Sequence, residues 1–133
     1  MPNHWLLKTE PSTYSWVDLE REKTAVWDGV SNPVALKNLA SMKPGDDALI
    51  YHTGGEKAVV GLARVTKAAY PDPKAKDPKL LVVEIAPVRR LAQPVSLADI
   101  KADPLFKESP LVRQGRLSVV PLNDEQFRKL VGG

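Results

Sequence analysis

Few side chains in this sequence are suited to carry out chemistry, and its two histidines are the first to consider. His52 follows an apolar run and stands directly before Gly54-Gly55, whereas His4 lies near the start of the chain. The sequence has no cysteine and no His-x-x-x-His or Glu-x-x-His spacing. It therefore lacks the set of nitrogen and sulfur ligands that a zinc site requires, and we expect neither a metal nor a cofactor.

Catalytic motifs are also missing from the sequence. There is no Gly-x-Ser-x-Gly motif to mark a serine nucleophile. The Gly54-Gly55 pair stands between two predicted strands, with no helix after it, so it is not a phosphate-binding loop. We predict no catalytic residue. The open alternative is an enzyme acting on a nucleotide or RNA, with His52 or Glu10 as its acid or base.

The aromatic residues point to binding instead. The chain holds three tryptophans and three tyrosines, and several adjoin polar residues at the ends of predicted elements, as in Trp27-Asp28 and Tyr51-His52. An aromatic face beside a few directed polar groups is how proteins hold an unstacked base. Packing in the core is the competing interpretation for each ring. The residues by themselves leave a small-molecule-binding and a nucleic-acid-binding module open.

The composition is that of one soluble globular domain, which we expect to span residues 1–133. No apolar run approaches the roughly 18 residues of a membrane helix, and the start lacks the features of a signal peptide. We therefore expect a cytoplasmic protein with no membrane contact, and we favour a monomer. The net charge of +3 permits a polyanionic partner without requiring one.

Short elements, separated by 12 prolines, must position these residues. Strands are predicted at 5–8, 24–29, 48–51, 58–69, 80–91 and 117–122. Helices are predicted at 15–23, from the cap at Asn32-Pro33, from Ser96 and from Asn123, with an irregular turn or short helix over 104–115. The order lacks the alternation of a doubly wound sheet. It favours an α+β, mainly β fold: a small, mostly antiparallel barrel flanked by short helices.

Seven motifs follow one another along the chain: WLLKTEP at 5–11, WDGVSN at 27–32, MKPGD at 42–46, YHT at 51–53, GLARV at 61–65, YPDP at 70–73 and RLSV at 116–119. In this order and over nearly the whole chain, they resemble the EVE domain family of the PUA-like superfamily. The resemblance implies a twisted barrel of five to six strands with helices around it. It also implies a noncatalytic nucleic-acid-binding module that reads a modified base, in DNA or RNA, flipped into an aromatic-lined pocket.

On this basis we hypothesise a pocket at the mouth of the barrel. Its ligand-binding residues are Trp27, Asn32, Tyr51, His52 and Ser118, and its phosphate or backbone contacts are Lys8, Lys57, Arg64 and Arg116. Trp27 is expected to stack on a base. Tyr51 and His52 leave their strand on opposite faces, and His52 is favoured as the polar pocket wall. Asn32 is assigned either to a base edge or to a helix cap.

The sequence departs from the family pattern after Gly29-Val30, where the family usually has arginines. Ser31 and Leu36 stand in this region instead. Serine does not replace the bidentate contact of an arginine with phosphate or a base edge. A protein-interaction module with a degenerate pocket is therefore a third functional class beside the reader and the enzyme.

Overall fold

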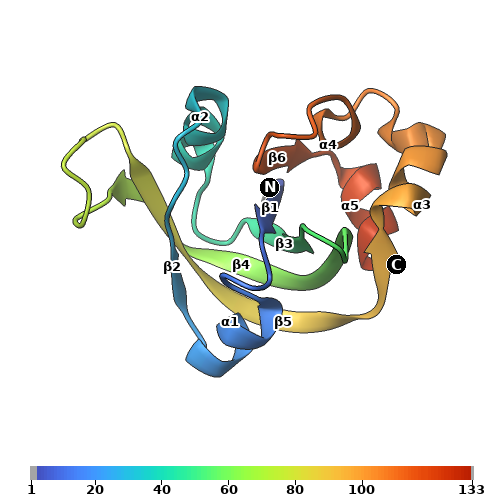
Figure 1. Cartoon of the computed structure of the whole chain (residues 1–133), viewed down its shortest axis with the longest axis horizontal. Coiled ribbons are helices and arrows are strands. Elements are labelled where there is room, and N and C mark those ends of the chain that lie inside the picture. Colours follow the sequence, from blue (N-terminus) through green and yellow to red (C-terminus); the bar gives the residue numbers. More distant parts are fainter. Residues whose placement is uncertain (1–2, 133) are drawn as a thin grey trace.

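A six-stranded sheet dominates the fold in the computed structural model, which describes residues 3–132 (Figure 1). The strands are β1 (His4–Thr9), β2 (Ala25–Trp27), β3 (Asp47–His52), β4 (Ala58–Pro71), β5 (Leu81–Ser96) and β6 (Val119–Leu122). The helices are α1 (Trp16–Glu22), α2 (Pro33–Ser41), α3 (Leu97–Ala102), α4 (Pro110–Arg113) and α5 (Asp124–Val131), with a 3-10 turn over Pro104–Phe106. The expected mainly β class and PUA-like fold are confirmed.

The sheet is mixed and is not closed by hydrogen bonds. Its strand order is β2-β5-β4-β3-β1-β6, so β2 and β6 are its two edges. β1 and β3 are parallel, whereas the other neighbours are antiparallel. The parallel pair arises because α1, β2 and α2 form a crossover between β1 and β3. The sheet curls so that β2 turns back toward β1 and β6, and the gap between the edges is called the seam below (Figure 1).

The capping residues set the helix boundaries as the sequence predicted. Ser15 and Asp18 form a reciprocal capping box at the start of α1. The side-chain oxygen of Asn32 accepts from the backbone N–H groups of Val34 and Ala35 at the start of α2. Each cap supplies an acceptor to N–H groups that have no partner within the helix. The turns before both helices are thereby fixed in place.

Gly61 in β4 allows α1 to pack closely on the sheet. A Cβ atom at this position would lie 2.5 Å from the Trp16 ring, which is a steric clash. Trp16 is 2% exposed, and the β4–β5 register shifts between Val59 and Gly61. A glycine inside a strand indicates either a bulge or close packing, and both are present at Gly61.

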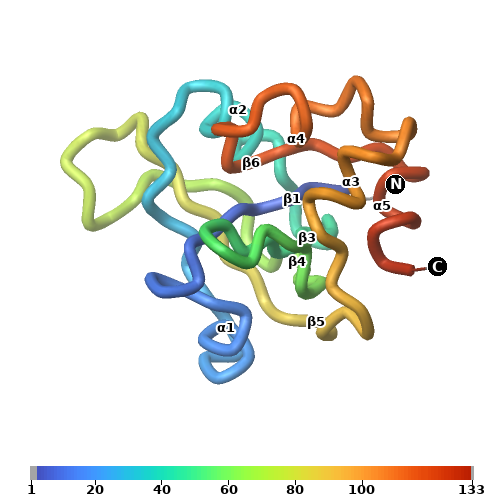
Figure 2. The backbone as a smooth tube through the Cα atoms, turned by 45° about the vertical axis from the view of Figure 1, so that its right-hand side comes forward, coloured from blue at the N-terminus to red at the C-terminus, as the bar shows by residue number. Residues whose placement is uncertain are grey.

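β4 and β5 extend beyond their predicted ends, to Pro71 and Ser96. Local prolines suggested earlier ends, but the two strands pair with each other through four register shifts and continue. The loop of residues 72–80 projects from the body of the molecule in both views (Figures 1 and 2). The predicted irregular stretch over 104–115 contains the 3-10 turn and α4.

Candidate functional site

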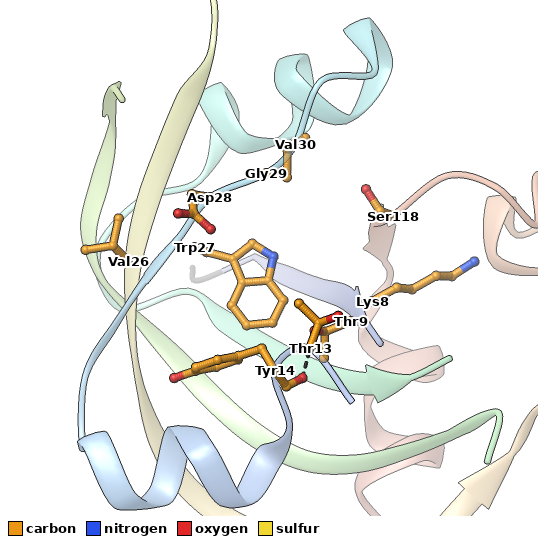
Figure 3. Close-up of a pocket in the computed structure, with 10 residues that line it drawn as sticks. All are labelled: Lys8, Thr9, Thr13, Tyr14, Val26, Trp27, Asp28, Gly29, Val30 and Ser118. Carbon is orange, nitrogen blue, oxygen red and sulfur yellow. Dashed lines mark hydrogen bonds between the residues drawn. The ribbon is translucent and has the colours of Figure 1, made fainter. Parts of the chain in front are cut away.

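A pocket of about 400 Å³ occupies the seam between the two sheet edges (Figure 3). Ten residues line it: Lys8, Thr9, Thr13, Tyr14, Val26, Trp27, Asp28, Gly29, Val30 and Ser118. They come from the end of β1, the segment before α1, β2 and the residues after it, and the segment before β6. The volume is within the range of roughly 300–1,000 Å³ that small-ligand pockets occupy. We call this cavity the seam pocket.

Trp27 forms one wall of the seam pocket. Its backbone is opposite Val83 in the β2–β5 ladder, and its side chain is 7% exposed. The Tyr14 ring meets the indole edge to face, with centroids 6.0 Å apart and planes at 85°. In Figure 3 the indole nitrogen is on the side of the ring that faces Ser118. No side chain or carbonyl of residues 3–132 hydrogen-bonds to this nitrogen, so its N–H is available to a ligand.

Ser118 and Lys8 form the opposite wall. The backbone N–H of Lys8 donates to the Ser118 carbonyl at 2.9 Å, which continues the β1–β6 pairing by one residue. The Lys8 ammonium donates to the Gly115 carbonyl at 2.9 Å and so points away from Trp27 (Figure 3). Burial lowers the pKa of Lys8 from its usual value. Trp27 and Ser118, two of the predicted ligand-binding residues, thus line the same pocket, with Lys8 beside Ser118.

Asp28, Gly29 and Val30 follow β2 along the rim of the pocket. Asp28 is exposed, and its carboxylate lies above the indole in Figure 3. Gly29 has φ of +79°, a conformation that favours glycine and turns the chain from β2 toward α2. Sequence reasoning did not assign Asp28 to the site. Its position directly after Trp27 was the only available signal, because exposed aspartates are common in turns.

Tyr14 lies beneath Trp27 with its hydroxyl oxygen buried. This oxygen makes no hydrogen bond of full geometry within residues 3–132, although the Glu22 carboxylate is close to it. Burial, followed by the charge of Glu22 and the approach of its side chain to the hydroxyl, raises the pKa of Tyr14 to about 12. The hydroxyl therefore stays neutral at physiological pH, and the ring acts as an apolar support for Trp27.

His52 lies outside the seam pocket and binds α1 to the sheet. Its Nε2 accepts from the backbone N–H of Trp16 at 3.0 Å, so the ring proton is on Nδ1 and is donated to Glu56 at 2.7 Å. The residue is buried, at 7% exposed. The structure thus gives His52 two partners within the protein and does not bring it to Trp27. Glu10, the other residue considered as an acid or base, accepts from Ser12 and Thr53.

Tyr51 leaves β3 on the other face and lines a second pocket, of about 200 Å³. The Lys8 ammonium lies 5.7 Å from the centre of its ring, within the range of a cation–π contact. Lys57, which precedes β4, also lines this second pocket. Tyr51, Lys8 and Lys57 are therefore close together, but only Lys8 also lines the seam pocket.

The remaining predicted residues lie apart from the seam pocket lining. Asn32 caps α2, as described above. Arg64 is paired with Asp47, at the end of the β3–β4 pair that is farther from Tyr51 and His52. Its guanidinium nitrogen lies 3.7 Å from an Asp47 carboxylate oxygen. Arg116 is exposed. Leu36, which occupies a position where an arginine was expected, packs against the hydrophobic core.

Within residues 3–132, no group of three or more His, Asp or Glu side chains is arranged to hold a metal ion. Among the helices of the described residues, none has both the length and the apolar character needed to cross a membrane.

Comparisons with known proteins give a consistent result. The family model described as "EVE domain" matches residues 3–132. Human thymocyte nuclear protein 1 is 32% identical over an alignment of 162 positions, which includes 96% of this chain and 72% of that protein.

Solved structures show the same similarity. A crystal structure of a protein from Agrobacterium tumefaciens is 38% identical, with a TM-score of 0.93, covering 98% of this chain and 91% of that one. The human THYN1 protein in complex with 5-methylcytosine-containing DNA is 30% identical, with a TM-score of 0.89. That similarity covers 98% of this chain and 96% of the human one.

Proposed function

The chain belongs to the EVE domain family, and from this premise we propose that it is a noncatalytic nucleic-acid-binding module that reads a modified base in the seam pocket. The observation that carries the proposal is the Trp27 wall, an aromatic ring with an unused N–H beside a cavity of about 400 Å³, which is large enough for a base. The human relative of known structure was crystallised with DNA containing 5-methylcytosine, which makes this base the first candidate ligand.

The pocket offers a separate contact for each part of a methylated cytosine. The Trp27 face supplies stacking, which is worth roughly 1–3 kcal/mol per base when such a ring is truncated. The Asp28 carboxylate is an acceptor for the exocyclic amine of cytosine. Val30, which is buried at the rim of the pocket, provides apolar surface for a methyl group. Ser118 adds a hydroxyl that donates or accepts.

A binding role is favoured over catalysis by the partners of the two candidate acid–base residues. His52 uses both ring nitrogens within the protein, and Glu10 accepts from Ser12 and Thr53. Neither residue lines the seam pocket. A general base must reach the proton that it abstracts, and these two side chains are already engaged elsewhere.

The direct test is an affinity measurement with single-stranded oligonucleotides that differ at one base, so that the cost of unpairing does not enter. We expect 5-methylcytosine to bind about 4-fold more tightly than cytosine, because burying one methyl group contributes about 0.8 kcal/mol. Equal affinity for all bases would overturn the reading of a modified base. No binding at low salt would overturn the whole proposal.

Asp28→Asn tests the assignment of the pocket. Thymine carries the same methyl group as 5-methylcytosine but has an acceptor in place of the amine. The wild type should therefore bind 5-methylcytosine more tightly than thymine. In Asp28→Asn the ratio of these two affinities should be near one, because an amide can donate as well as accept. Asp77→Asn, an exposed aspartate in the projecting loop, is the matched control and should keep the wild-type ratio.

A further inference from the structure

The second pocket, beside Tyr51, is surrounded by three lysines: Lys8, Lys57 and Lys101. We call it the lysine pocket. Its other lining residues carry no charge: Tyr51, Thr53, Gly54, Leu97, Leu111, Val112 and Gly115. The Glu10 carboxylate lies against Gly54 but is not part of the lining. Like charges around one small cavity repel one another, so this arrangement points to a ligand of opposite charge.

The three lysines come from separate elements that the backbone holds together. Lys8 is in β1, and Lys101 is in α3. Lys57 has φ of +47°, a left-handed conformation that costs a non-glycine residue roughly 1–2 kcal/mol. Its carbonyl accepts from the N–H of Leu97 at 2.8 Å, which joins the Gly-rich turn to the start of α3. The spacing of the three chain segments is therefore fixed before any ligand binds.

None of these cations is paired within the described chain. The ion pairs among residues 3–132 include neither Lys8 nor Lys57 nor Lys101. The Lys8 ammonium has a carbonyl and the Tyr51 ring as neighbours. Burial lowers the pKa of Lys8, so its charged form has lost water without gaining an anion. A bound anion would restore that lost stabilisation.

Lys8 lines both the lysine pocket and the seam pocket, so the two cavities are neighbours across the end of β1. We propose that the lysine pocket binds a backbone phosphate of the same strand whose base enters the seam pocket. This assignment rests on the proposed function. The volume of about 200 Å³, half that of the seam pocket, accommodates a phosphate group, and the three lysines match its charge. Lys101, which no sequence motif indicated, becomes a phosphate-binding residue.

The test is the salt dependence of oligonucleotide binding by Lys101→Gln. Each phosphate neutralised by a lysine releases condensed counterions, so losing one contact should lower the slope of log affinity against log salt by about 1. Affinity at low salt should fall equally for 5-methylcytosine and cytosine, because a phosphate contact carries no base information. Lys101 is exposed, so the substitution leaves the core intact.

Lys43→Gln is the matched control, since Lys43 is exposed and lies before β3, at the end of that strand opposite to Tyr51. Lys43→Gln should keep the wild-type slope of log affinity against log salt. An equal slope for Lys101→Gln and Lys43→Gln, in a protein that still prefers 5-methylcytosine, would overturn the phosphate site and leave the proposed function standing. A wild-type protein that binds 5-methylcytosine and cytosine equally would instead contradict the proposed function.

Neutral methylphosphonate linkages locate the contact on the strand. Replacing one linkage beside the modified base should weaken binding of the wild type and should weaken binding of Lys101→Gln much less, because the partner charge is already gone. Lys57→Gln should show the same pattern. If each linkage affects wild type and both variants equally, the lysines do not hold a strand phosphate and the proposal is wrong.

Discussion

Trp27 and His52 are equally buried, each 7% exposed, yet they occupy opposite kinds of environment. Both ring nitrogens of His52 have partners within the protein. The indole N–H of Trp27 has none among residues 3–132 and faces a cavity. At equal burial, an unused hydrogen-bonding group beside a cavity is what distinguishes a candidate binding residue from a structural one.

His52→Ala should have the largest effect, and the effect should be on stability alone. The substitution removes the acceptor for the buried N–H of Trp16, and an unsatisfied buried group costs about 1–3 kcal/mol in addition to the packing that is lost. Urea unfolding should show this decrease in the free energy of unfolding. The folded fraction should keep the wild-type preference for 5-methylcytosine over cytosine.

Glu56→Gln is the graded control for His52, because glutamine keeps an acceptor for the Nδ1–H group. Its stability loss should be smaller than that of His52→Ala. A stable His52→Ala protein that no longer distinguishes the two bases would place His52 in the binding site and remove the contrast with Trp27.

Trp27→Phe should have a smaller effect, mainly on binding. Phenylalanine keeps an aromatic face but has less stacking area and no N–H, so we expect affinity for the modified oligonucleotide to fall about 10-fold, equivalent to about 1.4 kcal/mol. Fluorescence anisotropy of a labelled strand measures this change. The melting temperature should be recorded with it, because Trp27 also belongs to the core.

Trp5→Phe is the matched control for Trp27→Phe. Trp5 is 6% exposed, and its indole N–H donates to Asp46 at 3.0 Å. The same substitution there should lower the free energy of unfolding and leave affinity unchanged. If both variants lose affinity in proportion to their stability, Trp27 is a core residue only.

Local chemistry was enough to predict most of the elements. Ser15, Asn32, Ser96 and Asn123 each cap a helix, because capping depends on residues within one turn. The long β4–β5 pair was underestimated, since its extent depends on pairing between strands rather than on local propensity. The open seam was also beyond local reasoning, because it is set by how the whole sheet curls.

The candidate site was less predictable for the same reason. Trp27, Ser118 and Lys8 were singled out as site residues, and the structure brings all three to the seam pocket. Asp28 stands in the WDGVSN motif but was not assigned a role, and Lys101 lies in no motif, so both became visible as site residues only through the cavities that they line. The position of His52 depends on a partner that is 36 residues away in the sequence. Contacts over that separation leave no periodic signal in a single sequence.

Tyr14→Phe should have the smallest effect. It tests whether Tyr14 only supports the Trp27 ring or whether its hydroxyl also contributes to ligand binding. The buried hydroxyl makes no hydrogen bond of full geometry within residues 3–132, so removing it at pH 7 should change the free energy of unfolding by less than about 1 kcal/mol. Affinity should stay unchanged, because the edge-to-face contact with Trp27 needs only the ring.

The pH dependence of Tyr14→Phe provides the sharper measurement. The pKa of Tyr14 is raised to about 12 in the folded protein, from an ordinary value near 10. Between these values the unfolded chain loses the proton that the folded protein keeps, so this group destabilises the fold as pH rises through that range. Urea unfolding should therefore show that, from pH 7 to pH 11, the free energy of unfolding falls less for Tyr14→Phe than for the wild type. Parallel declines would mean that the Tyr14 hydroxyl is solvated in the folded state, and its ring would then be less firmly held beneath Trp27.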